Sequence, residues 1–368
     1  MANTLIEELP KVQSEGRDEM LTKQESKILQ GVAFILMLFL HLFCVSKNVE
    51  MCKNSIFFGD IPLVSLLARA ANPVAMFLII SGYGQYVGYK KGAVNYREYL
   101  KKQLIRVLKL YICYWITLII FVGLGCFIAP QKYPGSWVKM VGNVIGYRYT
   151  YNAESWFLLP YSIISLLSYY LFRLKERLGN LFSFISAFLL SIVAVFLISR
   201  VGEKGMARPL YLLTLVASFI LPFLLGVFIY SLRLKELVHR VLRSVVKRCG
   251  LAECLVSPLA LSLLIALIIC RIIINTDILN SFYALAFILL FVNIKRGKTV
   301  DKILYALGLK CLVMWLIHTY FCYYLFHDFI YGLRYPALIY IVMLLLSYIV
   351  SIPIDYAAKQ VAKRVIPE

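Results

Sequence analysis

The sequence predicts an all-α protein: a polytopic membrane helix bundle of about ten transmembrane helices with both termini in the cytoplasm. Composition carries the first part of this prediction. Apolar and aromatic residues make up 61% of the 368 residues and charged residues only 16%, against roughly 45–50% and about 25% in soluble domains. The position of the charges carries the second part, because Lys and Arg gather in alternate breaks between apolar runs, as cytoplasmic loops do.

The chain divides into three segments. Residues 1–27 are charged and have no apolar core of the kind found in signal peptides, so we expect no cleavable leader and assign them to a cytoplasmic segment. Residues 28–356 form one transmembrane domain, and 357–368 a cytoplasmic tail. The domain contains ten apolar runs of about bilayer length, at 28–46, 64–88, 108–129, 156–172, 180–199, 209–230, 252–270, 276–294, 303–327 and 336–355.

Two boundaries are weakly marked, so nine or eleven helices are the alternatives. They are the split at Asp277 and the stretch from Arg200 to Ser231. In the second run, Asn72-Pro73 predicts a break or kink. The small residues Ser81 and Gly82 predict a close backbone approach there, to a ligand or to another helix.

The net charge of +20 is explained by topology. With the N-terminus inside, the cytoplasmic segments hold 27 Lys and Arg and the outer loops hold 10. The excess is also attracted to the anionic headgroups of membrane lipids, and we expect no nucleic-acid partner. The nine cysteines are scattered, mostly within apolar runs, with no metal-ligand spacing, so we expect small buried hydrophobic residues and no metal site.

Four ionisable residues lie at membrane depth, where such groups are costly unless they face the bundle interior. They are His41, Arg69, Lys310 and His318. At about 1.5 Å per residue, both histidines fall just beyond the midplane, towards the outside. A single buried histidine is as easily a packing residue, but two at matching depth favour one shared site.

A polar stripe precedes His41 on the same helix. Gln30, eleven residues earlier, lies within about 20° of the same face, and Lys27 about 40° away. This arrangement suits a long ligand with a charged end at the cytoplasm and a reactive end in the membrane, and acyl-CoA has that shape. The alternative for Lys27 is an interfacial anchor.

Five motifs occur in order along the chain. They are Gln30 with His41; Phe77 with Ser81, Gly82 and Tyr83; the basic-to-aromatic stretch 96–115; Trp156, Phe157 and Leu158; and Gly308, Cys311, Met314, Trp315, Leu316, Ile317 and His318. With these motifs the chain resembles the acyltransferase-3 family, multi-pass membrane O-acyltransferases that modify sugars of bacterial surface polysaccharides. The likeness extends over about 25–356. The chain has Gln30 where the family has a basic residue and Cys311 where the family has a serine. The first difference affects the expected binding of the acyl donor, because Gln30 carries no positive charge.

The resemblance implies an enzyme of the bacterial plasma membrane that takes an acyl group, acetyl by family frequency, from acyl-CoA to a carbohydrate hydroxyl. Acetyl-CoA is then a donor substrate, and we expect no permanently bound cofactor. His41 is our choice of general base, since neutral histidine suits this chemistry near pH 7. Whether the transfer is direct or passes through an acyl-enzyme stays open.

The other candidates have supporting roles. His318 would orient the acceptor or support the oxyanion, and Ser81 would hydrogen-bond the donor or the base. We assign Lys27, Gln30 and Arg69 to substrate binding, with Arg69 able to meet an acceptor oxygen or phosphate. Glu154 could fix a histidine tautomer, although we favour an exposed loop carboxylate.

Two other functions are alternatives. The ionisable residues would equally line the path of a glycan transporter or flippase, against which we find no inverted repeat. A polymerase of glycan repeats would need a longer charged outer loop than 130–155.

Overall fold

The computed structural model describes residues 20–92 and 95–366. Most of the predicted cytoplasmic segment 1–27, with its expected lack of a leader, therefore lies outside the described residues, as do the last two residues of the tail. In the described part, regular structure is almost entirely helical, and the strands are the short antiparallel pair β1 (Phe57–Phe58) and β2 (Ile61–Pro62).

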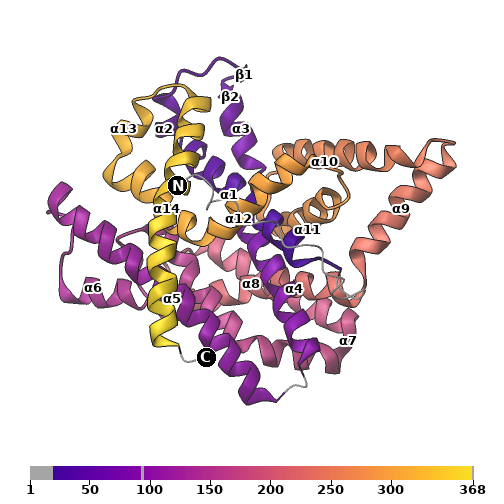
Figure 1. Ribbon diagram of the computed structural model, residues 1–368, viewed down its shortest axis with the longest axis horizontal. Helices are drawn as coiled ribbons and strands as arrows, with labels where there is room; N and C mark the ends of the chain where they lie inside the picture. The colour runs from indigo at the N-terminus through magenta and orange to yellow at the C-terminus, as the bar shows by residue number, and fades with distance from the viewer. Residues whose placement is uncertain (1–19, 93–94, 367–368) are drawn as a thin grey trace, which may run out of the picture.

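The helices are arranged as a bundle with peripheral arms (Figure 1). Their bounds are α1 Lys23–Phe43, α2 Ser46–Glu50, α3 Leu63–Arg69, α4 Pro73–Lys91, α5 Tyr96–Ile128, α6 Trp137–Val144, α7 Leu158–Arg200, α8 Arg208–Ser231, α9 Leu234–Arg248, α10 Val256–Ile273, α11 Asn280–Phe291, α12 Lys298–Thr319, α13 His327–Tyr331 and α14 Pro336–Val365. Short helical turns lie at η1 Ala153–Phe157, η2 Glu253–Leu255, η3 Asp277–Leu279 and η4 Tyr320–Leu325, the last a π-helix.

The predicted multi-pass helical fold is confirmed. Seven helical stretches in the described residues are long and apolar enough to cross a membrane: Lys23–Phe43, Leu63–Lys91, Tyr96–Ile128, Ala153–Arg200, Arg208–Ser231, Glu253–Ile273 and Pro336–Val365. The predicted run 180–199 lies in α7, and the run 156–172 starts at the end of η1 and continues in α7. The helix α7 breaks between these two runs at Gly179, a residue with φ of 75°. The runs 276–294 and 303–327 correspond to α11 and α12, which are not among the seven.

Two local predictions have different outcomes. The break at Asn72-Pro73 is confirmed, because α3 ends at Arg69 and α4 starts at Pro73, whose missing N–H costs nothing at the first helical position. The run 303–327 is helical as far as Leu325, but it is not one continuous α-helix. The α-helix ends at Thr319, and the chain then forms the π-helix η4 before α13.

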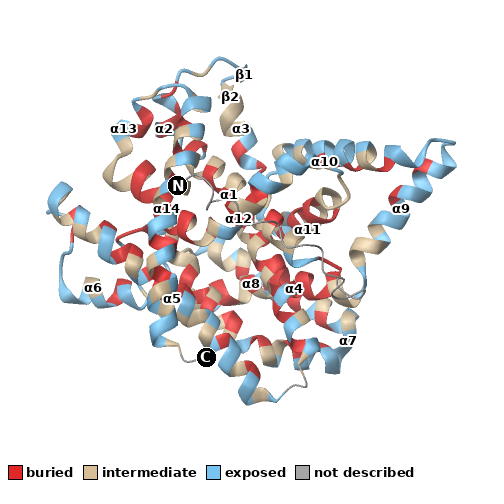
Figure 2. Cartoon of the chain, in the orientation of Figure 1, coloured by how far each residue is buried: buried red, intermediate tan, exposed pale blue. Residues whose placement is uncertain are grey.

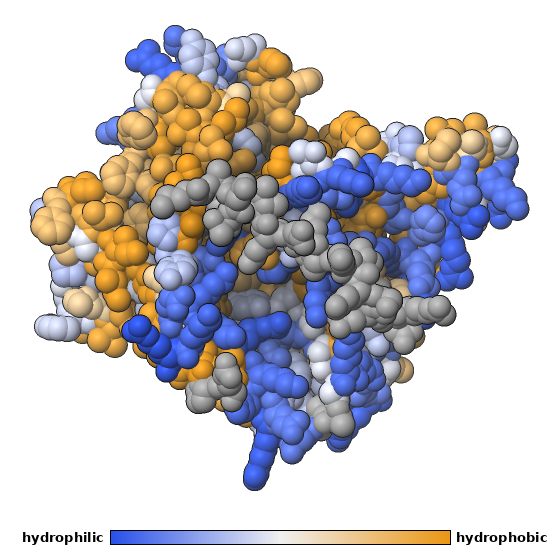
Figure 3. Space-filling model, viewed as in Figure 1, coloured by the Kyte–Doolittle hydropathy of each residue, from blue (hydrophilic) through white to orange (hydrophobic). Residues whose placement is uncertain are grey.

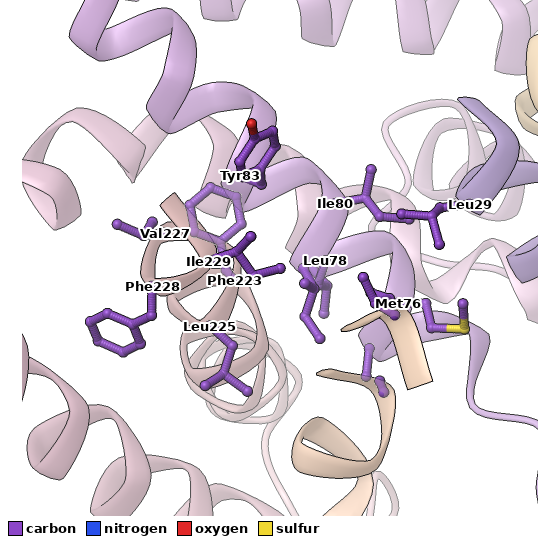
Figure 4. Packing of buried hydrophobic residues seen from close by; sticks show 14 of the residues in the cluster. Leu29, Met76, Leu78, Ile80, Tyr83, Phe223, Leu225, Val227, Phe228 and Ile229 are labelled. Carbon is purple, nitrogen blue, oxygen red and sulfur yellow. The ribbon is translucent and has the colours of Figure 1, made fainter. Parts of the chain in front are cut away.

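Glycine contacts hold the centre of the bundle together. A Cβ built on Gly82 of α4 would lie 1.9 Å from the carbonyl oxygen of Phe223 in α8, and one on Gly226 would lie 2.0 Å from that of Ile79. The close approach predicted from the small residues at 81 and 82 is therefore made to a helix. Figure 4 shows the apolar side chains of α4 and α8 that pack around this crossing, with Leu29 of α1 beside them.

Burial separates the bundle centre from its lipid-facing periphery. Figure 2 shows buried residues concentrated in α4, α8 and α11, while α10 and the lower part of α5 present many exposed positions. Large apolar side chains such as Ile119 (75% exposed) and Phe127 (87%) are among the exposed ones, as expected of a surface that meets acyl chains. Figure 3 shows apolar residues over the upper and left parts of one face and hydrophilic residues gathered in its lower half.

Candidate active site

The site begins with a second glycine crossing, between α1 and α12. A Cβ on Gly31 would lie 2.1 Å from the carbonyl oxygen of Leu304, and one on Gly308 would lie 1.8 Å from that of Lys27. The two backbones therefore touch, and the helices run in the same direction. Each helix continues for ten residues beyond its glycine and there carries a histidine, about 15 Å from the crossing. Equal spacing on parallel helices brings His41 and His318 to the same level.

The two imidazoles form a hydrogen-bonded pair. Nδ1 of His41 lies 2.6 Å from Nε2 of His318, and the ring planes differ by 4°. His318 is fully buried and meets the edge of Phe34, with ring centroids 6.1 Å apart. The two histidines, which the sequence places at matching depth, are thus in direct contact.

The hydrogen bonds assign the tautomer of both rings. Nδ1 of His318 lies 2.8 Å from the carbonyl oxygen of Trp315 and 3.2 Å from that of Met314. A carbonyl only accepts, so this nitrogen carries the proton, and Nε2 of a neutral His318 is an acceptor. Nδ1 of His41 must then donate to it. In a neutral His41, the remaining nitrogen, Nε2, then holds a lone pair.

A carboxylate stands next to that lone pair. Oε2 of Glu154, a residue of η1, lies 3.4 Å from Nε2 of His41, and its side chain is 24% exposed. The favoured sequence interpretation of Glu154 as an exposed loop carboxylate is therefore wrong. The separation exceeds a normal N–H···O hydrogen bond of 2.7–3.2 Å, and it is within the range of an ion pair once the ring is protonated.

Asn152 ties this carboxylate to the histidine helix. Its side chain is buried, its Nδ2 donates to the carbonyl of Leu316 at 3.1 Å, and its Oδ1 accepts from Thr319 Oγ1 at 2.9 Å. The same Oδ1 accepts from the backbone N–H of Glu154 at 3.0 Å. One amide thus fixes η1 on the last turn of α12.

The π-helix η4 contacts α1 and η1 beside the histidine pair. The hydroxyl of Tyr323 donates to the carbonyl of His41, and the hydroxyl of Tyr324 accepts from the backbone N–H of Ala153 at 2.8 Å. Single π turns are frequent at functional sites. Here the wide turn brings two successive tyrosines to α1 and to η1.

The polar stripe on α1 lies on the other side of the glycine crossing. Nζ of Lys27 donates to Oε1 of Gln30 at 2.9 Å, so the ammonium group lies beside the side-chain amide of Gln30. Cys311 lies beside the same amide, with its sulfur 3.9 Å from Oε1 of Gln30. These three residues form one cluster, separate from the histidines.

Ser81 is not part of the histidine pair. Its hydroxyl lies 2.9 Å from that of Tyr161 and accepts from Nε2 of Gln85 at 2.9 Å. Tyr161 stacks on Phe157, whose ring in turn meets Trp315. The serine is therefore linked to the backbone that holds His318 only through a row of aromatic rings.

Arg69 and Lys310 are also apart from the pair. Arg69 is exposed at the end of α3 and lines a cavity of about 1080 Å³. Leu40 of α1 and Cys44, the residue that follows α1, also line this cavity. Lys310 forms an ion pair with Asp355 of α14 at 2.5 Å, and Lys359 contacts the same carboxylate at 3.0 Å. It thus holds two helices together.

Sequence reasoning missed Asn152, Tyr323 and Tyr324. A signal for the first exists, since Asn two residues before Glu at the start of a helix is a capping pattern, and the structure has this hydrogen bond. The tyrosines lie within a predicted continuous helix, and nothing in their spacing indicates a π turn.

Comparison with known proteins gives one match. The family model described as an acyltransferase domain matches residues 25–356, nearly the whole chain. No curated protein and no solved structure matches the chain.

Proposed function

The chain belongs to the acyltransferase-3 family, and from this premise we propose that it moves an acyl group, acetyl in the first instance, from cytoplasmic acyl-CoA to a hydroxyl of a carbohydrate. The acceptor is a cell-surface polysaccharide or its lipid-linked precursor, and the enzyme works in the bacterial plasma membrane. His41 is the general base. One observation carries the proposal: the hydrogen-bond chain that leaves Nε2 of His41 with a lone pair.

The chemistry needs one proton acceptor at the attacking oxygen. The acceptor hydroxyl attacks the thioester carbonyl, and Nε2 of His41 takes its proton as the new C–O bond forms. The C–S bond then breaks, and the departing sulfur of CoA takes a proton, which the imidazolium can supply. General base catalysis of this kind contributes about 10²–10⁴-fold to the rate.

Two residues set up the base. His318 acts as a positioning residue, because its Nε2 accepts the proton of His41 Nδ1 and so directs the basic nitrogen away from it. Glu154 lies 3.4 Å from that basic nitrogen and faces positive charge when the ring is protonated. A partly buried carboxylate at this distance stabilises the imidazolium of the transition state.

The proposed topology has ten transmembrane helices and both termini in the cytoplasm. In this topology the donor enters from the cytoplasmic side. Lys27 and Gln30 lie between this side and the histidines, and we assign them to the CoA end of the donor. The hydrophilic lower half of the face in Figure 3, which includes the ends of α4 and α5, fits an entrance for an anionic, water-soluble donor. Nothing in this assignment requires a bound cofactor or a metal.

The test combines a donor assay with product analysis. Cells carrying the intact gene, the deletion, His41→Ala or His318→Gln are compared by proton NMR of their surface polysaccharide, and purified protein is supplied with labelled acetyl-CoA. We expect His41→Ala to abolish acetylation and His318→Gln to lower it. The matched control is His239→Ala, because His239 is exposed and bonded to Asn293. Full acetylation by His41→Ala at normal protein levels would reject the assignment.

A further inference from the structure

A cavity lies beside the end of α1 that carries His41, and neither histidine of the pair lines it. Its volume is about 1080 Å³, and its wall is formed by the end of α1, by α2, by the β1–β2 turn, by α3 and the start of α4, and by the junction of α10 with α11. Leu40 and Cys44, which line it, flank His41 in the sequence. The space is large enough for a sugar unit with its neighbour, since ligand pockets range over about 300–1,000 Å³.

Arg271 is the buried charge on this wall. It is 8% exposed, whereas the Lys, Arg, Asp and Glu side chains that also line the cavity are exposed. Its guanidinium donates to the carbonyl of Ile274 at 3.1 Å, to Oδ1 of Asn275 at 3.0 Å and to Oδ1 of Asn280 at 2.8 Å. All three acceptors are neutral.

The hydrogen bonds leave the guanidinium incompletely satisfied. Arginine has five N–H donors, and the three contacts use three of them. Nε of Arg271 is buried without a partner, and no carboxylate in the described residues lies within 4.0 Å of the guanidinium. Burying a charge without a counter-ion costs several kcal/mol of desolvation free energy. Because Arg271 lies beside a large cavity, we expect an anion in that cavity to neutralise it.

A second guanidinium lies on the same wall. Arg69, at the end of α3, also has no carboxylate partner in the part of the chain that the structure describes, and α3 packs against α10. The carboxylates of the wall are Glu50, Asp60 and Asp277, and Lys53 is the remaining cation; all four are exposed. Solvent screens these exposed charges, which leaves the buried Arg271 as the strongest fixed charge.

We propose that this cavity binds the acceptor and that Arg271, with Arg69, holds an anionic group of it, the carboxylate or phosphate of a sugar. The inference rests on the proposed function, because it names the class of acceptor for the same reaction. Arginine is the side chain best suited to bind both anions through paired N–H donors. Asn54, Asn72 and Asn275, which also line the cavity, offer amides to the sugar hydroxyls.

The test measures binding in a protein that cannot turn the ligand over. Purified His41→Ala protein in nanodiscs is titrated with glucuronic acid, glucose 1-phosphate and methyl glucoside. We expect at least one anionic sugar to bind at least tenfold more tightly than methyl glucoside. The two anionic probes separate a carboxylated sugar from a phosphate-bearing one.

Substitutions identify the charge that is responsible. Adding Arg271→Gln should remove the preference for the anionic sugar, and Arg271→Lys should restore part of it. If the Arg271 variants do not fold, Arg69→Gln replaces them, because Arg69 is exposed. This variant should also weaken the preference for the anionic sugar. The matched control is Arg200→Gln, an exposed arginine at the end of α7 that does not line the cavity and contacts the Phe196 ring.

The outcomes separate this inference from the proposed function. Equal binding of all three sugars, or an anion preference that survives loss of both arginines, overturns the inference. The proposed function would still stand after such a result if the protein with His41 intact acetylates a neutral acceptor. Anion binding together with no acyl transfer to any acceptor would instead overturn the proposed function and keep the anion site.

Discussion

Replacing Gly308 with alanine should uncouple the two histidines from 15 Å away. The added Cβ would lie 1.8 Å from the carbonyl oxygen of Lys27. Because that atom belongs to the backbone, no side-chain rotation relieves the clash. The helices α1 and α12 must separate by about 1.6 Å to restore an ordinary contact of 3.4 Å.

The consequence at the site follows from the geometry. A shift of that size carried along α12 lengthens the 2.6 Å bond between the imidazoles to about 4 Å, which is no longer a hydrogen bond. The tautomer of His41 is then no longer fixed. A misplacement of about 1 Å costs on the order of 10² in rate, and overpacking costs about 1–3 kcal/mol of stability.

The assay is transfer of labelled acetyl from acetyl-CoA, together with thermal unfolding of the purified protein. We expect Gly308→Ala to fold with a lowered Tm and to lose about 100-fold in transfer rate. Gly84→Ala in α4 is the matched control, since a Cβ there meets nothing within 4 Å. This variant should keep the Tm and the transfer rate of the unaltered protein. Normal activity of Gly308→Ala would refute the view that the helix contact sets the pairing of the histidines.

Three further predictions concern the surroundings of the base. Glu154→Gln should lower the transfer rate by about 10–100-fold, equal to about 1.4–2.7 kcal/mol, with Tm unchanged, because only the charge opposite the imidazolium is lost; an unchanged rate would remove Glu154 from the mechanism. Asn152→Ala leaves buried partners unsatisfied and should lower the unfolding free energy by about 1–3 kcal/mol, measured by denaturant titration, with loss of activity; unaltered stability would contradict its tying role. Ser81→Ala should cost about 1 kcal/mol and keep most of the acyl transfer, since its hydroxyl bonds to Tyr161 and Gln85; a complete loss would return Ser81 to the site.

Several features could be predicted because they depend on local chemistry or on simple counting. Proline lacks an N–H and restricts the residue before it, so Asn72-Pro73 marks a place where a helix can end, although α8 and α14 continue through Pro222 and Pro353. The apolar runs exceed what any soluble fold can bury. The shared depth of His41 and His318 follows from the rise per residue, once both helices start on the same side.

Other features depend on contacts between distant segments. The environment of Glu154 is set by Asn152, which bonds to residues more than 160 positions later. Ser81 lies on the face of α4 that meets α7, and the periodicity of an almost wholly apolar helix does not indicate which face that is. The end of α12 at Thr319 is equally hidden, because the aromatic run 320–325 suits an α-helix as well as a π-helix.

The ion pair between Lys310 and Asp355 has a consequence for how the protein reaches its membrane. The helix α12, which carries His318, is not among the stretches apolar enough to span by themselves, and a lone lysine near its centre opposes insertion by roughly 2.5–3.5 kcal/mol. Its counter-charge lies in α14, which the ribosome makes later. We therefore expect α12 to remain at the translocon until α14 emerges and to enter the lipid together with it. His318, which α12 carries, would then reach its position beside His41 in one of the last steps of membrane insertion.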